Sequence, residues 1–148
     1  YGHWSAGWSF TTFNDYHFNV DGDGEIIYTR PLDEVPKATW HRNTGSIAIA
    51  LCCCYNARPD DLGEYPPTEA QIETLAKMFA VIAEVFDNPI DREHFMTHGE
   101  AANDDGYGLY SGDPDCRWDL EQLCDQDEIG TGGDILRGKA QWYLENGV

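Results

Sequence analysis

Polar and apolar side chains alternate along residues 16–20, where β-forming residues also predominate. Residues 21–24 read Asp-Gly-Asp-Gly, a composition typical of a turn, and residues 25–29 are again rich in β-branched and aromatic side chains. Together these segments predict a β-hairpin. The run at residues 45–52 is largely apolar, as in a strand buried on both faces, so we expect it at the centre of a sheet.

A long amphipathic helix is predicted after Thr68. Gln71 follows at the spacing of a capping box, in which each of the two side chains bonds to the other's backbone. Apolar residues then recur at helical spacing along one face: Ile72, Leu75, Phe79, Ile82 and Phe86. The Asp-Asn-Pro sequence at residues 87–89 is expected to end the helix, because proline cannot continue it.

The second half of the chain has weaker patterns, from which we expect four further elements. They are a short strand at residues 94–97 that presents His98, a loop at 101–115, a short helix around Trp118, Leu120 and Leu123, and a final helix capped by Asp134 that runs to Leu144. Strands and helices thus alternate around one apolar strand. This order predicts an α/β fold, a single domain over residues 1–148 with a central mixed β-sheet flanked by helices on both faces.

The chain is strongly acidic, with 27 Asp and Glu residues against 9 Lys and Arg residues and a net charge of -18. Such a charge repels nucleic acid phosphates and anionic membrane surfaces, so no nucleic-acid partner is expected. No apolar stretch approaches the roughly 20 residues of a membrane span, and no basic-then-apolar leader is visible. We therefore expect neither membrane insertion nor a signal peptide in this chain, and we expect a monomer.

The five cysteines form no evident disulfide framework, because their number is odd and three of them are adjacent, at residues 52–54. Consecutive residues of an extended segment point to opposite faces, so this run is also a poor metal site. We expect its cysteines to be small buried side chains. At most one disulfide is plausible, and the sequence does not say which residues would form it.

Three short segments place His or Asp beside glycine and turn residues, at residues 2–7, 97–100 and 112–115. A catalytic zinc ion uses three protein ligands and keeps one position open for water, and two histidines with one carboxylate are an acceptable set. His3, His98 and Asp113 are therefore candidate ligands. On spacing alone, each histidine is more often a surface or packing residue. A calcium loop at residues 19–30 is a weaker alternative, since Arg30 stands where a bidentate glutamate is expected.

Six motifs follow one another along the chain, at residues 3–7, 15–24, 43–49, 67–71, 97–100 and 113–120. In residue type and order they resemble those of a zinc amidase family that includes N-acetylmuramoyl-L-alanine amidases, phage amidase lysins and peptidoglycan recognition proteins. The likeness runs from residue 3 to about residue 123. Residues 39–45, 105–108 and 111–120 are most similar to phage and prophage lysins of Gram-positive hosts.

The resemblance implies a zinc-dependent peptidoglycan hydrolase that cleaves the amide between N-acetylmuramic acid and L-alanine of the stem peptide. It implies His3, His98 and Asp113 as the Zn²⁺ ligands, with Asp115 and Cys116 as alternatives for the third position. Bacterial peptidoglycan would be the partner. The protein would act at the bacterial cell wall, as a phage lysin released from the host cytoplasm or as a secreted enzyme.

The resemblance also implies roles around the metal. Tyr16 matches a catalytic tyrosine of the family and is the preferred transition-state stabiliser. Glu100 is a candidate proton acceptor, or a partner that orients a histidine. Many relatives carry Glu where this chain has Ala50, and Lys where it has Ser111, two residues before Asp113. Zinc and Tyr16 are therefore expected to carry more of the reaction than in those relatives.

The substrate cleft is expected to involve four residues of two loops: Trp40, His41, Asn43 and Tyr107. For Trp40, packing in the core is the alternative. Two other functions stay open at this point. One is a non-catalytic peptidoglycan-binding protein, which usually lacks the third metal ligand, and the other is an amidase that acts on soluble anhydro-muropeptides.

Overall fold

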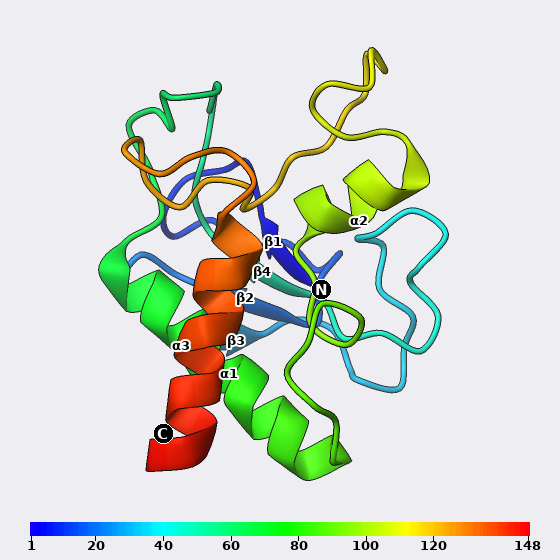
Figure 1. Cartoon of the computed structure of the whole chain (residues 1–148), viewed down its shortest axis with the longest axis vertical. Coiled ribbons are helices and arrows are strands. Elements are labelled where there is room, and N and C mark those ends of the chain that lie inside the picture. The colour runs from blue at the N-terminus through cyan, green and yellow to red at the C-terminus, as the bar shows by residue number, and fades with distance from the viewer.

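A four-stranded mixed sheet with the strand order β1-β4-β2-β3 forms the centre of the computed structural model, which describes residues 1–148 (Figure 1). β4 runs parallel to both β1 and β2, and β2 runs antiparallel to β3. Three helices complete the domain. The elements are β1 (Gly2–Trp4), β2 (Phe18–Val20), β3 (Ile26–Tyr28), β4 (Ile49–Leu51), α1 (Glu69–Phe86), α2 (His98–Asp105) and α3 (Gly132–Asn146).

The structure confirms the α/β class, the hairpin and the central strand. β2 and β3 pair across the turn that the Asp-Gly-Asp-Gly sequence predicts. In that turn the Asp21 carboxylate accepts the backbone N–H groups of Asp23 and Glu25. β4 lies between β1 and β2, and its three residues are buried.

α1 begins and packs as its sequence predicts. Thr68 is the N-cap, and the capping box with Gln71 is present on both sides. The Gln71 side chain is buried, and its Nε2 donates to the carbonyl oxygens of Val20 and Cys52, at 3.1 and 2.9 Å. One side chain therefore caps the helix and binds it to the ends of the two central strands.

The two long helices lie on the same side of the sheet. α1 contacts β2 and β4, and α3 packs along α1 (Figure 1). Gly2 also faces α1, because a Cβ built on it would lie 3.4 Å from atoms of Leu75 and Phe79. We expected helices on both faces; loops cover much of the other face, where His17 Nε2 meets the carbonyl oxygen of Glu34 at 2.8 Å.

Three predictions for the second half of the chain are wrong. Residues 98–105, expected to lie largely in a loop, form α2, because Thr97 and Glu100 make a second capping box. The segment around Trp118, Leu120 and Leu123 is not a helix but a series of turns, and Leu120 has a φ of 60° there. Residues 94–97 do not form the expected strand, and only Thr97 pairs with Gly2 at the sheet edge, in an isolated parallel bridge.

The C-terminal helix and the cysteines need smaller corrections. α3 begins at Gly132, with Thr131 at its N-cap. Asp134 does not cap the helix, because its carboxylate accepts from Arg137 one turn later. All five cysteines are free, and those at residues 52–54 are buried as expected. No helix combines the length and the apolarity that crossing a membrane requires.

Replacing Gln71 with leucine should destabilise the fold by about 2–4 kcal/mol, because the buried Cys52 carbonyl loses its donor, the Val20 carbonyl keeps only the Cys52 N–H, and α1 loses its capping box. The midpoint of urea unfolding should fall while the denaturant slope stays constant. Gln141→Leu is the matched control, since the Gln141 amide bonds only to Glu145 of its own helix. Equal midpoints for the two variants would contradict the role given to Gln71.

Candidate metal centre

Three buried side chains meet on the loop-covered face of the sheet: His3, His98 and Asp119. One potential ligand atom from each lies within 4.8 Å of the other two. Asp119 Oδ2 is 3.6 Å from His3 Nδ1 and 3.4 Å from His98 Nδ1. The two imidazole rings are 4.9 Å apart between centroids. Two histidines and a carboxylate around one point form a suitable ligand set for a zinc ion.

Strand alternation and the bridge at the sheet edge bring the histidines together. Because Gly2 faces α1, alternation along β1 turns His3 to the opposite face. Thr97 forms an isolated parallel β-bridge with Gly2, and the Gly2 N–H donates to the Met96 carbonyl at 2.9 Å. His98, the first residue of α2, therefore comes next to His3.

Apolar residues on either side hold Asp119 in place. Trp118 packs edge-on against Trp4, with ring centroids 4.5 Å apart, and Leu120 is fully buried in the core. The Gly99 N–H donates to the Asp119 carbonyl at 3.0 Å. Only a glycine permits this approach, because a Cβ at position 99 would lie 2.8 Å from that carbonyl oxygen.

The third member of the cluster differs from the residue that the sequence indicated. The structure places Asp113 and Asp115 on an exposed loop, where Asp113 Oδ1 accepts the N–H of Asp115 at 2.8 Å. Neither of them, nor Cys116, belongs to the cluster. The sequence carried a usable signal for Asp119, since it stands between two large apolar residues. Assigning that segment to a helix concealed the signal.

The electrostatics of the cluster favour a bound cation. Burial lowers the pKa of His3 from 6.5 to about 4, so its imidazole is neutral at neutral pH. Burial alone would raise the pKa of Asp119, but its interactions with His3 and His98 hold that pKa well below its usual range. His3 Nδ1 has no hydrogen-bond partner, because 3.6 Å to Asp119 is too long. A neutral imidazole nitrogen with a free lone pair beside an ionised carboxylate is what a zinc ion requires.

A hydroxyl group lies within hydrogen-bond distance of the Nε2 atom of each histidine. Thr39 Oγ1 lies 3.3 Å from His3 Nε2, and the Tyr107 hydroxyl lies 3.3 Å from His98 Nε2. With the ring proton on Nε2, each histidine would donate to its hydroxyl and direct the Nδ1 lone pair toward Asp119. Such outer partners fix the tautomer and orientation of metal-binding histidines.

A pocket of about 540 Å³ opens beside the cluster and is lined by His98, Asp119, Tyr16 and Arg117 among others. The Tyr16 ring lies 5.2 Å from the His3 ring between centroids. Burial, with the charge of Asp119 next in size, raises the pKa of Tyr16, so its hydroxyl keeps its proton. Arg117 was not among the sequence candidates. It stands two residues before Asp119 and is exposed.

Glu100 does not face this pocket. Its Oε1 accepts the Thr97 N–H, which closes the capping box of α2. Both carboxylate oxygens accept from the Arg137 guanidinium of α3, at 2.7 and 2.8 Å, and Arg92 lies 3.4 Å away. These contacts make Glu100 a structural residue that fixes the start of α2, and with it the position of His98.

A second pocket, of about 560 Å³, shares His98 and Arg117 with the first and brings together three of the four predicted substrate residues: Trp40, Asn43 and Tyr107. Trp40 is 60% exposed, which excludes core packing. His41 lies outside this pocket, with its ring against that of Trp40. Asn43 also has a structural task, since its Oδ1 accepts two backbone N–H groups of its loop.

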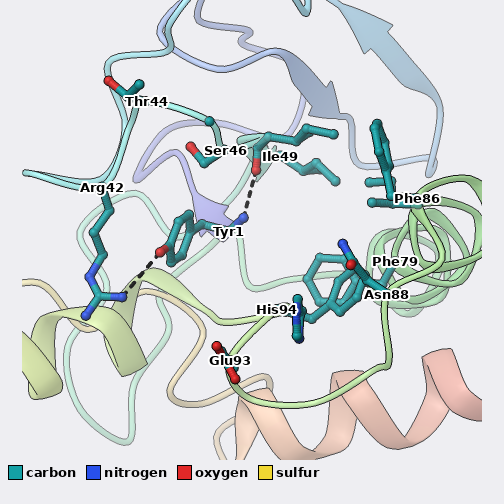
Figure 2. Close-up of a pocket in the computed structure, with 14 residues that line it drawn as sticks. Tyr1, Arg42, Thr44, Ser46, Ile49, Phe79, Phe86, Asn88, Glu93 and His94 are labelled. Atoms are coloured by element: carbon teal, nitrogen blue, oxygen red, sulfur yellow. Dashed lines mark hydrogen bonds between the residues drawn. The ribbon is translucent and has the colours of Figure 1, made fainter.

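A third pocket, of about 360 Å³, lies at the amino end of β1 and holds none of the cluster residues. Figure 2 shows it, with the Arg42 guanidinium directed at the Tyr1 hydroxyl, 3.3 Å away. Its histidine, His94, is bonded to Asp91 at 2.7 Å. The chemistry therefore concentrates around His3, His98 and Asp119.

Comparisons with known proteins give one match. A family model described as N-acetylmuramoyl-L-alanine amidase matches residues 3–114, which is most of the chain. Searches of curated proteins and of solved structures found no match. The matched segment contains His3 and His98 and ends before Asp119.

Measurements of zinc affinity should show whether Asp119 or Asp113 is the third ligand. Asp119→Ala should weaken zinc affinity by more than about 100-fold, beyond the loss typical of outer-shell partners. Asp113→Ala is the matched control and should stay within about twofold, because the loop carboxylate does not face the cluster. Titration calorimetry on metal-stripped protein measures both, with circular dichroism to check the fold. Retained affinity in the first variant and lost affinity in the second would restore Asp113 as the ligand.

Acid should destabilise the metal-free protein in a defined window. The folded pKa of His3, about 4, lies below its ordinary value of 6.5, so between these values the unfolded chain binds a proton that the folded chain does not. The contribution of His3 to stability should therefore be complete above pH 6.5 and fall by roughly 3 kcal/mol toward pH 4. Urea unfolding with a chelator present measures the effect. His3→Gln should flatten the profile, and an unchanged slope in that variant would assign the effect to other groups.

Proposed function

Because the chain belongs to the N-acetylmuramoyl-L-alanine amidase family, we propose that it is a zinc-dependent peptidoglycan hydrolase. It cleaves the amide between N-acetylmuramic acid and L-alanine of the stem peptide. The observation that carries this proposal is the buried cluster of His3, His98 and Asp119, with its unpartnered Nδ1 atom. The catalytic domain spans residues 1–148.

The cluster is suited to hold one zinc ion, with Asp119 in place of Asp113 as the third ligand. When bound, zinc polarises a substrate carbonyl and lowers the pKa of a water ligand to ~7. The hydroxyls of Thr39 and Tyr107 keep the two imidazoles oriented. The pocket beside the cluster gives the substrate amide access to it.

Tyr16 and Arg117 are the groups placed to stabilise charge on the substrate carbonyl oxygen. The raised pKa of Tyr16 keeps its hydroxyl a hydrogen-bond donor at neutral pH. Arg117 supplies a permanent positive charge on the rim of the same pocket. With Asp119 as a ligand, Arg117 takes the position two residues before it, where many relatives carry lysine. The cation that seemed absent at Ser111 is thus present as Arg117.

No carboxylate other than Asp119 lines this pocket. Ala50 stands opposite His3 in the register of β1 and β4, where many relatives carry glutamate. Glu100 is engaged with Arg137. The reaction therefore relies on zinc, Tyr16 and Arg117, without a separate carboxylate as proton acceptor.

We further propose that the protein acts as a monomer at the bacterial cell wall, as a lysin of phage or prophage type. The motifs at residues 39–45 and 111–120 support that type. The net charge of -18 argues against a nucleic-acid partner. A complete set of three ligands argues against a purely binding role. The open shape of both pockets suits a polymer better than a small soluble muropeptide, which remains the second candidate substrate.

Purified protein should release stem peptides with a new L-alanine amino terminus from intact sacculi, at a higher rate than from soluble anhydro-muropeptides. A chelator and His98→Ala should each abolish the reaction. Tyr16→Phe should keep zinc and lower kcat by about 100–1,000-fold, as expected for one lost donor to a developing oxyanion. Mass spectrometry of the products and zinc analysis give the readouts. Full activity of His98→Ala would refute the metal mechanism, and cleavage elsewhere would refute the bond assignment.

A further inference from the structure

Three aromatic side chains gather at the carboxyl ends of β1 and β4: Trp8, Tyr55 and Tyr65. The ring of Trp8 stacks on that of Tyr65 at 6.2 Å between centroids and meets that of Tyr55 edge-on at 6.1 Å. Trp8 is 56% exposed and Tyr55 is 45% exposed. Large aromatic surfaces grouped in this way and left open to solvent mark sites of binding.

Backbone hydrogen bonds hold this aromatic platform rigidly. The Tyr55 N–H donates to the Gly7 carbonyl, and the Cys54 N–H donates to the Tyr65 carbonyl at 2.6 Å. The Gly7 N–H in turn donates to Cys53. The rings are therefore presented in a fixed arrangement before any ligand arrives, which lowers the entropic cost of binding.

The platform adjoins, along the chain, residues that line the pocket beside the metal cluster. Ala6, Cys54 and Asn56 line that pocket, and they stand next to or two residues from Trp8 and Tyr55 in the chain. All three have a positive φ, of 57°, 69° and 57°. Such backbone strain in residues other than glycine is typical of functional sites. At these three positions the backbone turns between the residues that line the pocket and the residues that carry the exposed rings.

We propose that Trp8, Tyr55 and Tyr65 bind the glycan strand of the substrate, that is, β-linked N-acetylhexosamines beyond the sugar whose amide is cleaved. This inference rests on the proposed function. The substrate has a neutral glycan arm and a charged peptide arm, which diverge at the scissile amide. Uncharged aromatic rings suit the apolar faces of sugar rings.

The other pocket fits the peptide arm. It meets the first at His98, and Asp113 and Asp115 stand on its rim with Trp40. Lys37 and Arg117 line the same pocket, and charged groups of both signs suit the ammonium and carboxylate groups of a stem peptide, not a neutral sugar. The two arms thus have separate surfaces on either side of one cluster.

Binding of each arm can be measured separately. The probes are peptide-free glycan strands of several alternating N-acetylglucosamine and N-acetylmuramic acid units, and free stem peptide. Trp8→Ala should weaken glycan binding about five- to tenfold and leave peptide binding and zinc content unchanged. Trp8→Tyr should restore most of the affinity. Trp142→Ala is the control, since Trp142 is equally exposed, at 58%, but lies on α3.

Kinetics distinguish the failure of this proposal from that of the function. Trp8→Ala should raise KM on sacculi and leave kcat/KM on a single-sugar muramoyl peptide unchanged. If the wild-type protein binds glycan but has no amidase activity, the glycan-binding role of the platform stands and the proposed amidase function is refuted. An active enzyme whose Trp8→Ala variant matches wild type on glycan and sacculi would refute the platform, as would equal loss on both substrates. Self-association of the wild type that Trp8→Ala abolishes would assign the platform to a second copy instead.

Discussion

Two backbone hydrogen bonds at the edge of β1 bring the metal centre together. Gly2 donates to Met96, and Gly99 donates to the carbonyl of Asp119. They align three segments that are far apart in the sequence, so that His3, His98 and Asp119 meet at one point. Alternation along β1 turns His3 toward the cluster. The capping box starts α2 at His98, and the close approach of Gly99 to the Asp119 backbone brings in the Asp119 carboxylate. Each ligand is placed by backbone geometry, which side-chain packing then secures.

The local signals in the sequence predicted local structure well. The capping box at Thr68 and Gln71, the hairpin turn and the apolar run of β4 each depend on neighbours in the chain, and the structure confirms them. The same signal at Thr97 and Glu100 went unused, because glycine and aspartate nearby favoured a loop. The two histidines came together as predicted, although their role as ligands still awaits measurement.

The third member of the cluster, Asp119, and the roles of the residues around it could not be predicted in the same way. Asp119 lies beside the histidines because of the way its turn faces the core. Trp118 packs against Trp4 and Leu120 is buried in the core, and these two contacts fix the orientation of the turn. A motif of similar composition at Asp113 lies only six positions earlier. Glu100 was a catalytic candidate because it stands two residues after His98 in the sequence. Its partner Arg137 comes from another helix, and pairings over that separation leave no local pattern.

The ion pair between Glu100 and Arg137 also sets the order in which the protein can mature. Arg137 holds the Glu100 carboxylate and the carbonyl of Phe95, on either side of the segment that presents His98. The cluster of His3, His98 and Asp119 therefore reaches its final geometry only when α3 has docked. Contacts across so many residues form late in folding. If the cluster holds zinc as proposed, a chain in which α3 has not yet docked would bind the ion more weakly, so metal affinity would report on the docking of α3.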